Sequence, residues 1–304
     1  MIKRTLYFGN PAWLSVSNGQ LVIKDPLLKD YKDLAEKARV PIEDIGLVVL
    51  DHQQITITQT VLNLLLANNA AVVVCDDRRH PTGMLLNLNG NVVQAELFRH
   101  QIEASEPLRK QLWKQTVECK IQNQAAVLAN EQIDDAYLLE LASKVQSGDT
   151  GNREAQAAAW YWPRLIKELP DFRRFREGPP PNNLFNYGYA ILRAIVARSL
   201  VGSGLLPTLG IFHRNRYNAY ALADDIMEPY RPVVDAMVLQ LIRKTGVPET
   251  LTTEHKGFLL NIPVTDVILD GKASPLMAAV QRTTASLAQC YKGDQRKVLY
   301  PSLP

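Results

Sequence analysis

The sequence predicts an α+β fold, in which a small N-terminal β-rich domain is followed by a larger all-α C-terminal domain. Two observations carry this prediction. Within the first eighty or so residues, apolar side chains occur in short runs typical of strands, whereas beyond about residue 92 they recur every three or four residues, as in helices. The segment between these regions contains proline and glycine, which break regular elements. We therefore expect a β-rich domain over 1–80, a linker over 81–93 and an α-helical domain over 94–304.

Asn18-Gly19 is the clearest turn in the predicted β-rich domain. It lies between two short runs of alternating apolar residues, 14–16 and 21–23, and this arrangement is typical of a β-hairpin. The remaining elements of this domain follow in order: strands over 44–51 and 55–58, a helix over 58–69 and a strand over 70–75. These elements make the region up to residue 80 predominantly β.

Helical periodicity dominates the rest of the chain. Glycine and proline separate several of the periodic stretches, notably at 178–181 and 246–248. The predicted helices cover 94–129, 132–146, 152–168, 183–203, 219–244 and 274–291. The segment 252–272 follows no clear pattern, and the polar, proline-bearing end of the chain, 292–304, is expected to be a loose tail or a partner contact.

The composition is ordinary for a globular protein of two domains. Of 304 residues, 46% are hydrophobic and 21% are charged, and the net charge of +3 indicates nucleic-acid binding only if basic residues cluster locally. The three cysteines lack metal-type spacing. Neither a signal peptide nor a membrane-length apolar run is visible, so we expect a cytoplasmic protein with no membrane contact. Glycine-rich phosphate loops and a Gly-x-Ser-x-Gly motif are missing, which argues against nucleotide hydrolysis and serine hydrolases.

The stretch 210–232 combines groups that can bind a metal ion with groups that can bind an anion. His213 precedes three closely spaced acids, Asp224, Asp225 and Glu228. Imidazole with carboxylates can hold a divalent cation of the manganese or magnesium type. If the acids begin a helix, either aspartate would share a face with Glu228. Three arginines in the same stretch could hold an anionic substrate, so the set suits phosphodiester chemistry: Arg214, Arg216 and Arg231.

A structural role would explain the same residues without chemistry. Acids near a helix start favour its positive end, and a histidine after an apolar segment is often a hydrogen-bonded packing residue. Against this, the acids lie among apolar residues, which suggests burial, and a buried carboxylate without a nearby cation is costly. Glu154 is a third candidate: Asn152 is expected to cap its helix, and the small residues 155–159 would let another helix approach closely. Both readings of Glu154 stay open on this pattern.

Basic residues cluster in two further places, along the first long predicted helices and among aromatic residues over 160–176. Basic side chains neutralise phosphates and aromatic rings stack on unpaired bases, so both clusters could contact nucleic acid. A solvated helix face is the alternative. The residues expected to contact DNA are Arg99, Lys114, Lys120, Arg164, Arg173, Arg174, Arg214 and Arg216.

Several long motifs, in order, resemble one known family. They begin with TLYFGNP, PIEDIGLVVLD, ITITQ and HPTG, and continue with LWKQTVECKIQNQA, GDTGNREAQAAAWYW, NNLFNYGYAILRAIVARSL and GIFHRNRYNAYALADDIMEPYRPVVD. Over nearly its whole length the chain resembles the CRISPR-associated integrases, protein one of the CRISPR adaptation pair, in their type II form. Carried over residue by residue, the family's catalytic and metal-binding residues fall on Glu154, His213 and Glu228, with Asp225 as an accessory acid.

The resemblance implies an integrase and endonuclease that inserts captured foreign DNA fragments into a CRISPR array. Mg²⁺ or Mn²⁺ at the three residues would polarise the target phosphate while the fragment's 3′-hydroxyl attacks, so no protein nucleophile is needed. The implied partners are double-stranded and branched DNA, a second copy in a homodimer formed through the β-rich domain, and the small companion adaptation protein, protein two, in a heterohexamer. Two alternatives remain, a structure-specific nuclease of branched DNA in repair and a non-catalytic DNA-binding scaffold.

Overall fold

The chain folds into two compact units, Met1–Val92 and Val93–Pro304. The first unit is rich in strands and the second is mostly helical, which confirms the predicted fold class. In the part of the chain that the structure describes, no helix is both long enough and apolar enough to cross a membrane. The structure is a computed structural model, and it describes residues 3–26, 36–167, 169, 171–213 and 215–304.

Among the described residues of the first unit, the strands form two four-stranded sheets. In one sheet the strand order is β1-β5-β7-β8, and every neighbouring pair is parallel except β7 and β8. In the other the order is β4-β3-β2-β6, and every pair is antiparallel except β2 and β6. The strands are β1 (Arg4–Phe8), β2 (Ala12–Ser17), β3 (Gln20–Lys24), β4 (Glu36–Pro41), β5 (Ile45–Leu50), β6 (Ile55–Ile57), β7 (Ala71–Cys75) and β8 (Pro81–Leu85).

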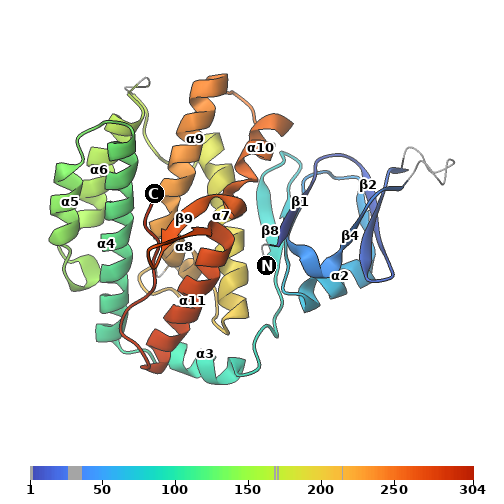
Figure 1. Ribbon diagram of the computed structural model, residues 1–304, viewed down its shortest axis with the longest axis horizontal. Helices are drawn as coiled ribbons and strands as arrows, with labels where there is room; N and C mark the ends of the chain where they lie inside the picture. Colours follow the sequence, from blue (N-terminus) through green and yellow to red (C-terminus); the bar gives the residue numbers. More distant parts are fainter. Residues whose placement is uncertain (1–2, 27–35, 168, 170, 214) are drawn as a thin grey trace. The chain divides into compact units, whose positions relative to one another are not determined.

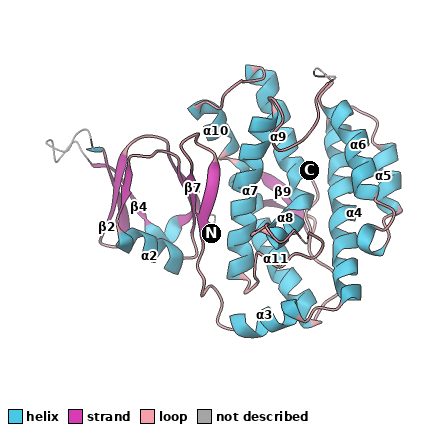
Figure 2. Cartoon of the chain, turned by 180° about the vertical axis from the view of Figure 1, so that it is seen from behind, coloured by secondary structure: helices cyan, strands magenta, loops and turns pink. Residues whose placement is uncertain are grey.

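Apolar side chains from both sheets and from α2 (Gln59–Ala67) form one core in this unit. Leu14 of β2, Leu21 of β3, Val48 of β5 and Leu65 of α2 are all fully buried in it. Figures 1 and 2 show the two sheets facing each other, with α2 closing one end of the space between them. Both sheets supply apolar side chains to this shared core, which is why the core lies between them.

Two local predictions in the first unit have different outcomes. The hairpin at Asn18-Gly19 is confirmed, because both residues have positive φ, 50° and 72°, and link β2 to its antiparallel neighbour β3. The predicted linker, 81–93, instead begins with β8, which pairs antiparallel with β7. Pro81 is the first residue of this edge strand, where its missing N–H removes no hydrogen bond from the interior of the sheet.

Helices dominate the second unit, and α7 is a largely buried one. Its residues Leu184, Ile191, Ile195 and Leu200 are fully buried, and it packs against α8, α9 and α11. Figures 1 and 2 also show α4 beside α5 and α6, which it contacts. The helices are α3 (Gln94–Ile102), α4 (Glu106–Asn130), α5 (Ala136–Ser143), α6 (Arg153–Leu165), α7 (Asn182–Gly202), α8 (Ala221–Met227), α9 (Arg231–Thr245), α10 (Thr253–Leu259) and α11 (Leu276–Lys292).

Two of the predicted long helices are interrupted. The helix predicted over 94–129 divides into α3 and α4, because Ser105 caps α4 by accepting a hydrogen bond from the backbone N–H of Leu108 at 3.4 Å. The helix predicted over 219–244 is interrupted by a 3₁₀ turn, Glu228–Tyr230, between α8 and α9. Pro229 has no N–H to donate within a continuous helix, which explains the break. Glu228 therefore lies at the junction of two helices.

The last third of the second unit holds more structure than the sequence predicts. Within 252–272 the chain forms α10, and the strands β9 (Asp266–Leu269) and β10 (Lys272–Pro275) form a small hairpin, so this unit is not all-α. The expectation of a loose tail over 292–304 is wrong. Ser302 exchanges two backbone hydrogen bonds with Ile268, each 2.8 Å long, and this pairing holds the end of the chain against β9.

Candidate active site

Lys120 joins two of the predicted site residues. Its ammonium nitrogen, carried by α4, lies 2.6 Å from Glu154 Oε1 in the first turn of α6 and 2.5 Å from Glu228 Oε2 at the start of the 3₁₀ turn. The Lys120 side chain is only 12% exposed. Burial alone would lower the pKa of Lys120, but Glu228 and Glu154 raise it above the ordinary value, so the side chain stays charged. Two acids distant in sequence are therefore bridged by one cation.

Glu228 is the most buried member of this cluster, with 4% of its side chain exposed. Burial would raise its pKa, but the charges of Arg231 and Lys120 outweigh burial and lower the pKa below the ordinary value. Arg231 Nη2 lies 3.0 Å from Glu228 Oε1, one helical turn further along the chain. The other oxygen, Oε2, pairs with the Lys120 ammonium. Glu228 is thus held as an anion by two cations.

Asp225 fixes His213 in place. Its carboxylate is fully buried and accepts hydrogen bonds from the backbone N–H groups of Ile211 at 2.6 Å, Phe212 at 3.0 Å and His213 at 3.3 Å. The same carboxylate lies 2.5 Å from Nδ1 of the His213 ring. This hydrogen bond raises the pKa of His213, and the charges of Glu228 and Glu154 act in the same direction. With Nδ1 occupied, Nε2 is the ring nitrogen left for a ligand.

Gly210 permits the close turn before His213. A Cβ atom at this position would lie 2.5 Å from the carbonyl oxygen of His213 and 3.0 Å from Asp225 Oδ2. The first distance is too short for any side chain, and the obstructing atom belongs to the backbone. The backbone can therefore turn back toward Asp225 here because glycine has no side chain to obstruct the turn.

The three acids that follow His213 have different partners. Asp224 pairs with Arg193, 2.6 Å from its Nε, and accepts a hydrogen bond of 2.8 Å from the Asn218 amide. Asp225 binds the histidine turn and Glu228 binds the two cations described above. The expectation that an aspartate shares a helix face with Glu228 stays a prediction: Asp225 contacts the histidine turn, and Asp224 forms a separate ion pair with Arg193.

Asp149 is a residue of this region that the sequence reasoning missed. The prediction that Asn152 caps α6 with its side chain is wrong, because Asn152 makes no such hydrogen bond. Instead Asp149 accepts hydrogen bonds from the backbone N–H groups of Arg153 at 2.8 Å and Glu154 at 3.0 Å. It is buried, and the preceding Gly148 has a positive φ of 72° that lets the chain reach back. The cap thus fixes the start of α6, the helix that carries Glu154.

The residues expected to contact DNA fall into distinct environments. Exposed side chains are those of Arg99, Arg173 and Arg216, whereas Arg214 lies outside the described residues. Arg216, although exposed, donates a hydrogen bond to the Tyr217 hydroxyl, and three others also have protein partners. Lys114 pairs with Glu118 at 3.4 Å, Arg164 lies over the Trp160 ring at 3.2 Å, and Arg174 donates to the side-chain oxygens of Asn182 and Asn186. Lys120 differs most from the expectation, because its ammonium is turned into the acid cluster.

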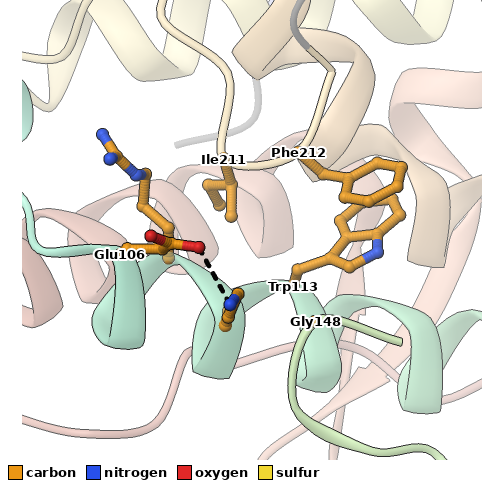
Figure 3. A pocket seen from close by; sticks show the side chains of 7 residues that line it. Glu106, Trp113, Gly148, Ile211 and Phe212 are labelled. Atoms are coloured by element: carbon orange, nitrogen blue, oxygen red, sulfur yellow. Dashed lines mark ion pairs between the residues drawn. The ribbon is translucent and has the colours of Figure 1, made fainter. Parts of the chain in front are cut away.

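A pocket of about 310 Å³ lies beside the histidine turn. The rings of Trp113 and Phe212 stack with centroids 4.3 Å apart and planes 2° from parallel, and Phe212 is 48% exposed. Figure 3 shows this stack on one side of the pocket and Glu106, with its ion pair to Lys110, on the other. The Trp113 ring also meets the His213 ring edge-on. An aromatic and charged wall therefore adjoins the candidate active site.

Glu154, His213 and Glu228 fit a divalent cation by their chemistry, since carboxylate oxygens and imidazole nitrogen are ligands of Mn²⁺ and Mg²⁺. The buried Oε2 of Glu228, paired with the Lys120 ammonium, is a ligand atom that such an ion could use. Within the described residues, however, no three His, Cys, Asp or Glu side chains are gathered closely enough to hold a metal ion as they stand. The ammonium of Lys120 lies between two of the three candidates instead.

A family model described as CRISPR associated protein Cas1 matches residues 6–270 of the chain. The chain belongs to the Cas1 family. The CRISPR-associated endonuclease Cas1 of Neisseria meningitidis serogroup C (strain 8013) is 37% identical over 289 residues, which cover 94% of this chain and 91% of the relative. The CRISPR-associated endonuclease Cas1 2 of Pyrobaculum aerophilum is 30% identical and covers 82% and 88% of the two chains. The resemblance in the motifs is confirmed, and the type II form stays a prediction.

Solved structures share the fold of this Cas1 chain. A casposase bound to an integration product has a TM-score of 0.78 at 20% identity, with 98% of this chain and 92% of that chain covered. A Cas1 protein from Thermotoga maritima has a TM-score of 0.74 at 17% identity and covers 97% and 99%. A chain of a Cas6-RT-Cas1–Cas2 complex has a TM-score of 0.76 at 20% identity, with 100% of this chain and 36% of that chain covered.

Proposed function

We propose that this Cas1 chain is a metal-dependent integrase and endonuclease that inserts captured foreign DNA fragments into a CRISPR array and cuts branched DNA. The observation that supports this most is the cluster in which Lys120 bridges Glu154 and Glu228 beside an imidazole fixed by Asp225. The reaction class is supported by curated relatives named endonucleases and by a fold neighbour solved as a casposase with an integration product.

Glu154, His213 and Glu228 are the residues that would hold Mg²⁺ or Mn²⁺. Two carboxylates and one imidazole suit either ion, and nitrogen ligation favours Mn²⁺. When bound, the ion would polarise a phosphodiester and offset the charge that develops on it. Asp225 orients the imidazole for this purpose through Nδ1, and Asp149 fixes the start of the helix that carries Glu154.

The chemistry needs no protein nucleophile. The fragment's 3′-hydroxyl oxygen forms a bond to the target phosphorus, and the bond from that phosphorus to the 3′-oxygen of the target strand breaks. The attacking hydroxyl loses a proton and the leaving oxygen gains one. Water in place of the 3′-hydroxyl gives strand cleavage. Arg231, 26% exposed and paired with Glu228, keeps a positive charge beside the acids, where it can stabilise an anionic phosphate.

DNA and protein partners complete the proposal. Exposed Arg99, Arg173 and Arg216 are available to phosphates of double-stranded or branched DNA, and Arg214 is proposed to act with them. A homodimer formed through the first unit, joined to a small companion adaptation protein in a heterohexamer, would present several such surfaces to one duplex. The solved Cas6-RT-Cas1–Cas2 complex, one chain of which shares this fold, supports a companion of this kind.

The first test uses a labelled branched DNA that mimics a half-integrated fragment, incubated with the full chain and Mn²⁺, Mg²⁺ or a chelator. Glu228→Gln and His213→Ala are each expected to slow processing by about 10²–10³-fold while DNA binding persists. The control is Asp235→Asn, a substitution of a buried acid outside the cluster, which is expected to keep the wild-type rate. Wild-type binding without processing under either metal would contradict the proposal and favour a DNA-binding scaffold.

A second arm adds the companion protein and a target that contains CRISPR repeats. Joining of the fragment into the repeat is expected only when the companion is present. Branched-DNA cleavage with no joining to the repeat, with or without the companion, would instead favour a repair nuclease.

A further inference from the structure

Lys120 occupies the position of a counter-ion between two acids from different elements. Its nitrogen is within 2.6 Å of one oxygen of each, Glu154 Oε1 and Glu228 Oε2. Both are close contacts between opposite charges. With 12% of the lysine, 24% of Glu154 and 4% of Glu228 exposed, water screens these charges little. One ammonium therefore offsets the repulsion between two carboxylates that would otherwise be forced together.

Arg231 cannot play the same part. Its guanidinium contacts Glu228 through the other oxygen, Oε1. A cation at Oε1 of Glu228 contacts neither Oε2 of Glu228 nor Oε1 of Glu154, the two oxygens that Lys120 joins. The bridge between the two acids depends on Lys120, and Arg231 is positioned to remain while that bridge opens.

A divalent cation at the proposed site would need the oxygens that Lys120 already contacts. Metal–oxygen distances of about 2.0–2.2 Å for these ions are shorter than the contacts of the ammonium, and a metal ion and an ammonium sharing two oxygens repel each other strongly. Lysine is suited to leave, because its charge is compact and readily hydrated and its four-carbon stem is flexible.

We propose that Lys120 is a resident counter-ion that holds Glu154 and Glu228 together and must leave them before a divalent cation binds. This inference rests on the proposed metal site. The lysine thereby weakens metal binding, since the energy of its two ion pairs is lost when the metal enters. It also keeps the acids close and paired until the metal arrives.

The test is calorimetric titration of Mn²⁺ into the full chain without DNA, with Lys120→Met as the main variant. Methionine has a similar length and no charge, so Mn²⁺ is expected to bind about tenfold more tightly or better. In chelator the same variant is expected to melt at a lower temperature than wild type, because two buried carboxylates lose their shared cation. Lys120→Arg keeps the charge and is expected to show no gain in Mn²⁺ affinity.

Lys144→Met is the matched control. Lys144 forms an exposed pair with Glu140 within α5, so losing it is expected to leave Mn²⁺ affinity unchanged. Should circular dichroism show that Lys120→Met does not fold, Lys120→Gln takes its place with the same expectation. An Mn²⁺ affinity equal to or weaker than that of wild type in the folded, uncharged variant overturns the inference.

Glu228→Gln separates this inference from the proposed function. If wild type binds Mn²⁺ and Glu228→Gln does not, the metal site stands, and only the Lys120 variants decide the role of the lysine. If wild type and Glu228→Gln bind Mn²⁺ equally, or neither binds it, the proposed metal site itself fails.

Discussion

Glu228 and Asp235 are both buried acids near the start of α9, yet their surroundings move their pKa values in opposite directions. At Glu228 the charges of Arg231 and Lys120 outweigh burial and lower the pKa. At Asp235 burial prevails and raises the pKa from 3.8 to about 7. The nearest partners of Asp235 are hydroxyl groups, that of Tyr189 at 2.5 Å and that of Tyr161 at 3.2 Å.

The difference separates an acid suited to chemistry from an acid suited to structure. A carboxylate kept ionised by cations can exchange one cation for another, as a metal ligand must. The carboxyl group of Asp235 has a raised pKa and is hydrogen-bonded to two tyrosines, so it links helices instead. Tyr161 lies in α6, Tyr189 in α7 and Asp235 in α9. Burial alone does not distinguish the two roles, and the neighbours do.

Asp225 offers the strongest test of this comparison, because it is a buried acid whose partners are N–H groups. Asp225→Asn removes acceptor capacity from the 211–213 turn and places an amide against the imidazole. Mn²⁺ affinity and the rate of branched-DNA processing are expected to fall by about 10–100-fold. The measurements are calorimetric titration and the strand-processing assay.

The control for this prediction is Asp224→Asn. Asp224 pairs with Arg193 away from the histidine, so its loss is expected to affect the melting temperature without changing Mn²⁺ affinity. Wild-type Mn²⁺ affinity in Asp225→Asn would show that the imidazole needs no carboxylate to orient it.

The raised pKa of Asp235 predicts a particular pH dependence of stability. Between about pH 4 and pH 7 the folded chain keeps a proton on Asp235 that the unfolded chain releases. The contribution of this proton to the free energy of unfolding is therefore complete below about pH 4 and is lost as the pH rises through about 7. The charges of Arg174 and Arg231 oppose the shift, and the hydroxyls of Tyr161 and Tyr189 face the same carboxyl group.

Asp235→Asn, which cannot ionise, tests this dependence by urea unfolding at pH 5, 6, 7 and 8. Wild type is expected to lose stability relative to the variant as the pH rises, by at most about 1.4 kcal/mol per pH unit up to about pH 7. Parallel pH profiles for the two proteins would mean that Asp235 is already ionised at pH 5.

Asp149→Ala is expected to have the smallest effect. It removes the acceptor for two backbone N–H groups at the start of α6, so the free energy of unfolding should fall by about 1–2 kcal/mol. Asn152→Gly, at a nearby position with a positive φ and no side-chain cap, should change it much less. Equal losses in the two variants, measured by chemical denaturation, would assign the cap to both residues.

Several features of the fold could be predicted because their causes are local. The Asn18-Gly19 hairpin follows from a turn type that demands positive φ at both residues. The helical stretches follow from spacing, and their ends shift where a cap or a proline intervenes, at Ser105 and Pro229. The strand β8 was missed because proline and glycine indicate a break, although an edge position tolerates both.

The sequence by itself determined the α+β character of the chain, its family and the residue types available to the site, because these depend on composition, spacing and motif order. Only the tertiary structure decided the partners. It turned Lys120 from an expected DNA contact into the bridge between Glu154 and Glu228, and gave Asp225 to the imidazole. It also bound the C-terminal end against β9. The Lys120 bridge joins segments far apart in sequence, and its burial makes it important, since a charge removed from water is costly unless an opposite charge lies beside it.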